Sequence, residues 1–377
     1  MPKFNKNSIL ALFVLIGTIV GAGMFGLPYV FAKSGILPAL FYFPLLVGIT
    51  MFLHLAFGEI FLRTGDDCRL AGLARKYLGK GYGRLATFSV VAGLTGSLLA
   101  YIILAGQFLS TILPFDISAF NCSLIFALAS LPFIFKGMKV VAPMEIFTNI
   151  AFFIIIIFIF AVGIPKVDLS NFSLINLPHV FLPYGVLMFS LVGFSAVAEA
   201  ESILRPEEKG GMKRIIKTAF FLVSIIYILF TLIVVGVSGD KTSADVFSGL
   251  SSFLGPEVIF LGSLAALITV ADSFLVVALY LRNSLVCDQR FSKPLASSFV
   301  GFIPALLFLM GITSFIDVIG FLGTIIGVIE GIIIILLYNK SKTLGDHEPE
   351  YTVKVPKVVL FLCGLVLVLG AVLQFII

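Results

Sequence analysis

Long apolar segments recur along the whole chain, separated by short stretches that hold charges, glycines and prolines. Hydrophobic residues make up 60% of the 377 residues and charged residues 12%, whereas a soluble domain has about 45–50% and about 25%. An apolar run of about 20 residues is long enough to cross a bilayer as a helix. The sequence therefore predicts an all-α integral membrane protein with about eleven transmembrane helices. These are expected near residues 8–32, 36–62, 86–113, 120–136, 141–164, 179–204, 214–238, 256–282, 294–311, 314–338 and 355–377.

Lysine and arginine are distributed unevenly between the two sides that these spans define. If the N-terminus lies in the cytoplasm, the outer loops hold only Lys33, Lys166 and Lys241, and every other basic residue falls on the inner side. Cytoplasmic loops of membrane proteins carry such an excess. We therefore expect a multi-pass protein of the cell (plasma) membrane with a cytoplasmic N-terminus and an extracellular C-terminus. A short cytoplasmic helix is expected over 66–78 and an external re-entrant hairpin over 240–253.

The first apolar segment has Gly21-Ala22-Gly23 at its centre and Pro28 shortly after it. Glycine is a poor helix former and also lets another group approach the backbone closely. A helix break at this depth frees amides and carbonyls, which lipid tolerates only where they are buried in protein or line a cavity. The sequence therefore predicts a discontinuous helix whose second half begins near Met24. The alternative is that these small residues only allow close helix packing.

The sixth segment has a similar centre, with Ser190, Gly193 and Ser195 among apolar residues. Spans one and six are five apart, and a repeat with an odd number of spans re-enters the membrane upside down. Paired interrupted segments in corresponding positions of two inverted halves are typical of a transporter's binding site. We therefore expect a second discontinuous helix here.

Two motifs, over 17–29 and 182–196, resemble those of the amino acid/auxin permease group, which includes the aromatic amino acid permeases. That group lies within the amino acid–polyamine–cation superfamily of LeuT fold, and the resemblance extends over nearly the whole chain. It implies a single transporter domain, 1–377, built from five plus five inverted helices with one additional C-terminal helix. The implied units are 8–164, 179–338 and 355–377.

An amino acid would meet complementary backbone groups at the two breaks. The amides of Gly21, Ala22 and Gly23 lie at the N-terminus of a half-helix, where a carboxylate is stabilised. Carbonyls around Phe189 and Ser190 would accept hydrogen bonds from the α-ammonium group. These five residues are the core of the predicted substrate site.

Three further residues complete the predicted pocket. Tyr101, in the middle of the third span, is a candidate hydroxyl donor to the carboxylate, since a buried tyrosine hydroxyl needs a partner. Phe194 corresponds, by the resemblance, to an aromatic residue that closes over the substrate. Gly193 leaves room for a side chain. No basic residue inside the spans indicates an acidic substrate, so we expect a neutral one, with aromatic or large apolar amino acids as candidates.

Asp272 lies deep in the eighth span, where a carboxylate costs about 2.5–3.5 kcal/mol and needs a partner. Thr269, Asp272 and Ser273 share one helical face and offer hard oxygen ligands, which suit a hard cation. The pattern resembles the Asp-Ser pair of one sodium site in neurotransmitter–sodium symporters. The resemblance implies carbonyls of Gly17 and Val20 as the remaining ligands of a Na⁺ site.

Two alternatives for Asp272 stay open. It could carry a proton in place of sodium binding, or it could form a structural hydrogen bond to a neighbouring polar side chain. Glu330, in the tenth span, is a weaker candidate for a proton relay.

We therefore expect a secondary active transporter that imports amino acids by sodium symport and alternating access. The alternatives are a proton-coupled symporter with Asp272 or Glu330 as carrier, and an amino acid sensor on a transporter fold. An enzyme is not expected, because the spans hold no nucleophile–base or metal motif. The expected partners are the amino acid and the lipid bilayer, with no nucleic acid and no organic cofactor.

Overall fold

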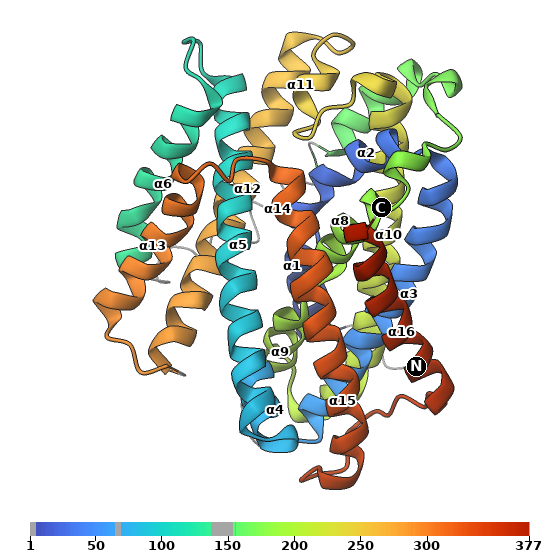
Figure 1. Ribbon diagram of the computed structural model, residues 1–377, viewed down its shortest axis with the longest axis vertical. Helices are drawn as coiled ribbons and strands as arrows, with labels where there is room; N and C mark the ends of the chain where they lie inside the picture. The colour runs from blue at the N-terminus through green and yellow to red at the C-terminus, as the bar shows by residue number, and fades with distance from the viewer. Residues whose placement is uncertain (1–4, 65–68, 137–153, 155, 288, 377) are drawn as a thin grey trace.

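The computed structural model describes residues 5–64, 69–136, 154, 156–287 and 289–376, and within them it is helical without strands. The helices form a bundle whose members run roughly along one axis (Figure 1). In the first part of the chain they are α1 (Lys6–Ile19), α2 (Gly23–Ser34), α3 (Ile36–Leu62), α4 (Leu70–Leu78), α5 (Lys80–Ile112) and α6 (Ala119–Lys136). In the second part they are α8 (Leu182–Leu191), α9 (Phe194–Ile203), α10 (Met212–Ser238), α11 (Phe247–Leu250), α12 (Pro256–Cys287), α13 (Lys293–Leu309), α14 (Phe315–Phe321), the π-helix η7 (Leu322–Gly327), α15 (Val328–Leu344) and α16 (Lys357–Ile376). Short 3₁₀ turns η2 (Ile164–Lys166), η3 (Leu169–Asn171), η4 (Leu177–His179), η5 (Pro206–Gly211) and η6 (Gly239–Lys241) lie between them.

The expected spans are present in the described part of the chain. Eight helical segments are long and apolar enough to cross a membrane, and α1 with α2 forms a ninth that is bent by 49°. Two shorter apolar helices, Ile156–Lys166 and Lys293–Leu309, fall on the two remaining predicted segments. The all-α membrane fold is therefore confirmed. Residues 137–153, which hold the start of the fifth predicted span, lie outside the described residues.

The two interrupted spans cross each other at the centre of the bundle. The first half of span one, α1, packs on the second half of span six, α9, while α2 packs on α8. The breaks thus lie next to each other. The 33-residue helix α5 runs the height of the bundle and packs on α12, α6 and α4, which gives the centre a rigid wall (Figure 1).

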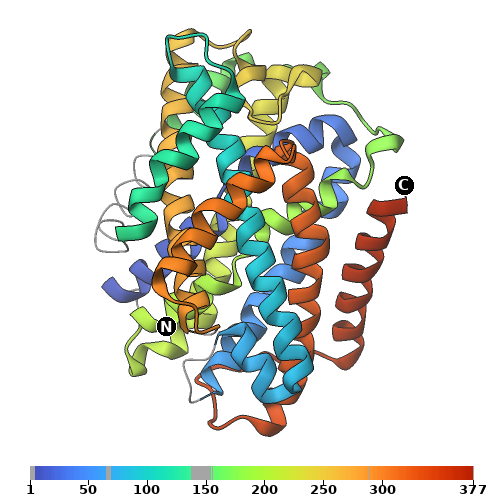
Figure 2. The ribbon, with the colours of Figure 1, turned by 60° about the vertical axis from the view of Figure 1, so that its left-hand side comes forward.

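The C-terminal helix α16 stands at the edge of the bundle, apart from most other helices (Figure 2). Only 11% of its apolar stretch Lys357–Gln374 is buried by the rest of the protein, as expected for a helix that faces lipid. Two polar contacts attach it. The Tyr184 hydroxyl donates to the Leu367 carbonyl at 2.8 Å, and the Thr324 hydroxyl donates to the Gln374 side chain at 2.7 Å.

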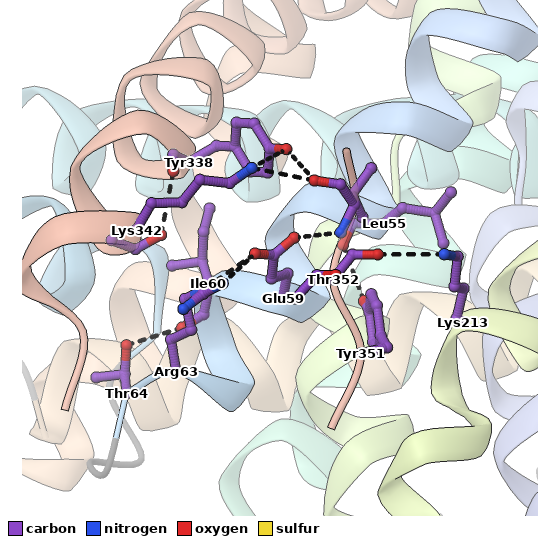
Figure 3. A network of polar contacts seen from close by, with 12 residues as sticks. Leu55, Glu59, Ile60, Arg63, Thr64, Lys213, Tyr338, Lys342, Tyr351 and Thr352 are labelled. Atoms are coloured by element: carbon purple, nitrogen blue, oxygen red, sulfur yellow. Dashed lines mark hydrogen bonds and ion pairs between the residues drawn. The ribbon is translucent and has the colours of Figure 1, made fainter. Parts of the chain in front are cut away.

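The connection between α15 and α16, residues 345–356, is fastened across one end of the bundle (Figure 3). Glu59 of α3 is fully buried; one carboxylate oxygen accepts from Arg63 at 2.8 and 2.9 Å, and the other accepts the Val353 amide at 2.6 Å. The Tyr351 hydroxyl donates to the Leu55 carbonyl at 2.8 Å. A charge buried among helices is tolerated because its partners are all in place.

The short helix expected over 66–78 is present as α4, which begins at Leu70; residues 66–68 of the predicted range lie outside the described residues. Its cytoplasmic side stays a prediction. The predicted hairpin over 240–253 is occupied by η6 and α11 at the opposite end of the bundle (Figure 1). These two ends are called the α4 end and the α11 end below.

Removing the Glu59 carboxylate tests whether the 345–356 connection stabilises the bundle. Glu59→Ala leaves the Arg63 guanidinium and the Val353 amide without their acceptor, so we expect a loss of about 3 kcal/mol in stability. The matched control is Asp346→Ala, which removes an exposed ion pair to Lys76 from the same connection and should cost about 0–1 kcal/mol. Thermal unfolding in detergent measures both, and equal melting temperatures would contradict the prediction.

Candidate functional site

The first break follows directly from the glycine cluster. Helix α1 ends with the Val20 amide bonded to the Ile16 carbonyl at 2.8 Å, and α2 begins at Gly23. The first bonds after the break are weak turns, from Met24 to Gly21 at 3.3 Å and from Phe25 to Ala22 at 3.1 Å. Among the described residues, the amides of Gly21 and Gly23 bond to no other backbone group. The positive end of the α2 dipole therefore lies at this break.

The second break separates α8 from α9 at Val192 and Gly193. The Val192 amide closes α8 on the Met188 carbonyl at 3.1 Å, and Gly193 has an extended φ of −168°. The Ala196 amide then starts α9 on the Gly193 carbonyl at 3.0 Å. Both predicted discontinuities are therefore confirmed, and each falls within a residue or two of the predicted position.

A cavity of about 160 Å³ lies between the two breaks. All eight residues predicted for the substrate site line it. They are Gly21, Ala22, Gly23, Tyr101, Phe189, Ser190, Gly193 and Phe194. The fold thus brings together residues that are distributed over three separate spans, and their role in binding a substrate stays a prediction.

Tyr101 connects the first break to the eighth span. It lies in α5, is 7% exposed, and its hydroxyl lies close to the Ser273 side chain and to the Ala22 backbone. A Cβ atom on Gly21 would lie 3.1 Å from the Tyr101 hydroxyl oxygen. The absence of a side chain at Gly21 therefore lets the tyrosine hydroxyl reach the unwound backbone.

Gly23 shows that close packing also contributes at the first break. A Cβ atom there would lie 2.7 Å from the Ser190 Cα atom, so α2 and α8 approach each other as only a glycine allows. The packing interpretation thus holds for Gly23 alongside its place in the cavity wall, because one face of the residue contacts α8 and another faces the open space.

The five residues predicted to bind sodium lie on two helices. Gly17 and Val20 are at the end of α1, and Thr269, Asp272 and Ser273 form one turn of α12. The Thr269 hydroxyl donates to the Ala265 carbonyl of its own helix at 3.0 Å. Tyr101 links Ser273 to the first break, so the two parts of the predicted set share a neighbour. The five residues are outside the described lining of the cavity, and sodium binding stays a prediction.

The cavity extends toward the α4 end, where Arg69 and Leu70 line it together with Tyr280 of α12. The Arg69 guanidinium lies over the Tyr280 ring, 4.2 Å from its centroid. A cation on an aromatic face is stabilised by the ring, and the Glu199 carboxylate also lies within electrostatic range of Arg69. Arg69 and Tyr280 therefore mark the mouth of the cavity at this end.

Toward the α11 end, four buried phenylalanines pack beyond the first break. Phe25 of α2 lies 5.2 Å from Phe108 and 6.1 Å from Phe230, and Phe108 lies 5.7 Å from Phe247 of α11, between ring centroids. Each is at most 2% exposed. Edge-to-face aromatic packing of this kind excludes water. Phe247, from the segment predicted as an external hairpin, therefore helps to close the cavity toward this end.

Sequence reasoning missed the π-helix η7, which forms one wall of the cavity. Leu322, Gly323, Ile326 and Gly327 of this element line the cavity, and Glu330 follows in α15. The Glu330 carboxyl group lies close to the Ser89 side chain. π-Helices are frequent at functional sites, and the spacing of Gly320, Gly323 and Gly327 in an apolar span is the available sequence signal.

Sequence reasoning also gave no role to His54, which the structure places against the second break. Its Nδ1 donates to the Thr50 carbonyl at 2.8 Å, and its ring lies 4.6 Å from the Phe194 ring. A Cβ atom on Gly193 would lie 3.8 Å from Nε2. Sequence reasoning gave no role to Tyr227 of α10 either. Its hydroxyl hydrogen-bonds to a backbone carbonyl at each of the two breaks.

Glu201 and Arg205 are four residues apart, which would place them side by side in a continuous helix, but α9 ends at Ile203 and the chain then leaves the helical path. Glu201 pairs with Lys209 instead.

Two discontinuous helices whose breaks face one cavity, as here, are the arrangement found in transporters of the LeuT fold. The chain matches the crystal structure of MhsT in complex with L-phenylalanine with a TM-score of 0.61, over 97% of each chain and at 14% identity. A model of the tryptophan/tyrosine permease family matches residues 5–376, and the chain belongs to this family. No curated protein matches the chain.

The protein is therefore an amino acid permease and not an enzyme. The aromatic amino acid permease part of the predicted resemblance is confirmed by the family match. The label of the amino acid/auxin permease group stays a prediction.

Gly323 tests the wall of the cavity. A Cβ atom at this position would lie 1.8 Å from the Gly185 carbonyl oxygen, so Gly323→Ala must push η7 away from α8. We expect a loss of stability of about 1–3 kcal/mol. Gly48→Ala is the control, because that helical glycine has no atom within 4 Å of an added Cβ, and it should be neutral or stabilising by up to about 1 kcal/mol. Equal thermal unfolding of the two variants would contradict the predicted contact.

Proposed function

We propose that the protein imports neutral amino acids with aromatic or large apolar side chains by sodium symport and alternating access. The single observation that carries this proposal is the cavity between the two helix breaks, which is lined by unwound backbone and small residues. Such backbone groups complement both charges of a zwitterion. The family's name and the L-phenylalanine in the MhsT complex support an aromatic side chain.

In the proposed binding mode, the carboxylate meets the amides of Gly21, Ala22 and Gly23 and the hydroxyl of Tyr101. The free amides at Gly21 and Gly23 and the adjacent α2 dipole support this assignment. The apolar side chain lies toward Phe189, which is the half-buried aromatic residue of the cavity wall. The α-ammonium group meets carbonyls at the end of α8.

For the coupling ion, we propose that Gly17, Val20, Thr269, Asp272 and Ser273 bind Na⁺. The position of the Tyr101 hydroxyl, close to Ser273 and to the backbone of Ala22, supports this set, since it lies between the α12 turn and the first break. Carboxylate, hydroxyl and carbonyl oxygens are suitable ligands for a hard cation. A proton on Glu330 is the second candidate, favoured by the position of that carboxyl group in the cavity wall.

Alternating access would use the two ends of the bundle. The Phe25, Phe108, Phe230 and Phe247 cluster closes the cavity toward the α11 end, and the cavity mouth at Arg69 lies toward the α4 end. With the N-terminus in the cytoplasm, as the distribution of basic residues predicts, this arrangement corresponds to an inward-facing state. The inverted halves 8–164 and 179–338 would then rock around the fixed site.

Uptake of radiolabelled amino acids into proteoliposomes tests the proposed function and the coupling ion together. We expect uptake of an aromatic amino acid that is driven by an inward sodium gradient. In Asp272→Asn the sodium dependence should be lost, because a ligand charge is removed from the ion site. Glu330→Gln is the matched comparison and should keep it. Sodium dependence that survives in Asp272→Asn would contradict coupling through Asp272, and its loss in Glu330→Gln would point to Glu330 instead. Uptake driven only by a pH gradient would contradict sodium coupling altogether.

Gly21→Ala tests the carboxylate site. The added methyl group presses on the Tyr101 hydroxyl at 3.1 Å and covers the unwound amides, so we expect the affinity for the amino acid to fall about tenfold. Isothermal titration of the purified variant measures this change. Gly48→Ala is the control for a helical glycine remote from the cavity. Wild-type affinity in Gly21→Ala would count against the assigned role of this backbone.

A further inference from the structure

The hydroxyl of Tyr227 lies between the ends of two helices that are interrupted in the membrane. It lies 2.7 Å from the Ile19 carbonyl oxygen and 2.8 Å from the Ser190 carbonyl oxygen. Ile19 is the last residue of α1, and Ser190 lies in the last turn of α8. Tyr227 itself is fully buried in the middle of α10. One side chain of a third span therefore contacts both breaks.

Both carbonyl groups need a donor from outside their own helix. Within α1 and α8 a carbonyl is satisfied by the amide four residues later, but each helix ends before that amide is reached. A buried carbonyl left without a donor is destabilising, because it has lost its hydrogen bonds to water and gained none in the protein. The Tyr227 hydroxyl supplies this donor. It has a single proton, which the Ile19 and Ser190 carbonyl oxygens share.

A simpler explanation would be that a buried tyrosine satisfies its own hydroxyl wherever it can. Tyr184 is an example, since it is equally buried and donates to one carbonyl, that of Leu367, within the continuous helix α16. Tyr227 differs because its two acceptors belong to different helices and both lie at a break. Its hydroxyl therefore fixes the distance between the two unwound segments.

We propose that Tyr227 is a positioning residue of the substrate site. Its hydroxyl holds the ends of α1 and α8 at one point, so that the free amides after α1 and the carbonyls at the end of α8 face the same cavity. For its effect on a substrate, this inference rests on the proposed function. For the geometry of the two breaks, it stands on the hydrogen bonds alone.

The test compares Tyr227→Phe with Tyr184→Phe, which removes an equally buried hydroxyl elsewhere. Hydrogen–deuterium exchange is measured without substrate, on peptides that cover residues 16–24 and 188–196. We expect exchange in Tyr227→Phe to rise about tenfold in both peptides together, since the hydrogen bond is worth about 1.4 kcal/mol. Tyr184→Phe should leave both peptides as in the wild type.

Transport kinetics give a second readout. The KM for the aromatic amino acid should rise about tenfold in Tyr227→Phe, and the maximal rate should stay within about twofold of the wild type. The reason is that the two hydrogen bonds of Tyr227, called the clamp below, support binding of the substrate in its ground state. Replacing Tyr227 with para-aminophenylalanine keeps the ring and offers one N–H to each carbonyl. This variant should restore both protection from exchange and KM.

Several results would overturn the inference. These are faster exchange at one break only, unchanged exchange at both, the same change in Tyr184→Phe, or no recovery with para-aminophenylalanine. If Tyr227→Phe does not fold, the para-aminophenylalanine protein decides, because wild-type protection supports the clamp and loosened breaks contradict it. If the wild type transports no amino acid, the proposed function fails, while the exchange experiment still decides the role of Tyr227.

Discussion

Backbone groups that are freed inside a bilayer have to find partners within the protein, because lipid offers none. Two spans of this protein are interrupted at mid-depth, and the partners come from neighbouring helices: Tyr101 at the first break and Tyr227 at both. The amides that stay free face the cavity between the breaks. The same constraint that makes the interruptions costly therefore confines them to one place, and that place is the candidate site.

Glycine contributes to this arrangement in two physically different ways. At Gly21 the missing side chain lets a tyrosine hydroxyl approach unwound backbone, which is a property of the site itself. At Gly23 and Gly323 it lets helices approach so closely that an added Cβ would overlap a neighbouring backbone. A binding surface made of backbone needs both, since amides must be exposed and the surrounding helices must still pack without voids.

The two ends of the cavity are closed by different kinds of contact, apolar at one end and polar at the other. Interlocking phenylalanines close the α11 end, and this closure is apolar and insensitive to charge. The α4 end is polar, with Arg69 lying over the Tyr280 ring at the mouth. Polar contacts at a helix end exchange for water at little cost, whereas an aromatic cluster must separate as a unit. The two ends would therefore open by different routes.

Much of this architecture follows from the sequence alone. The apolar runs determined the number of spans, and the glycines at 21 and 23 with the small residues around Gly193 located both helix breaks, because backbone preference and hydrophobic length are local properties. The eight predicted substrate-site residues lie at or near these breaks or in the third span, and the packing of the spans brings them into one cavity. Tyr227, His54 and the π-helix were decided only by the tertiary structure. The sequence around a tyrosine or histidine in an apolar span does not show whether its side chain contacts lipid, the protein core or an unwound backbone. A π-turn depends on how closely a neighbouring helix packs. Which carbonyl a side chain reaches is set by the crossing of helices that are far apart in the chain, and no local pattern records that crossing.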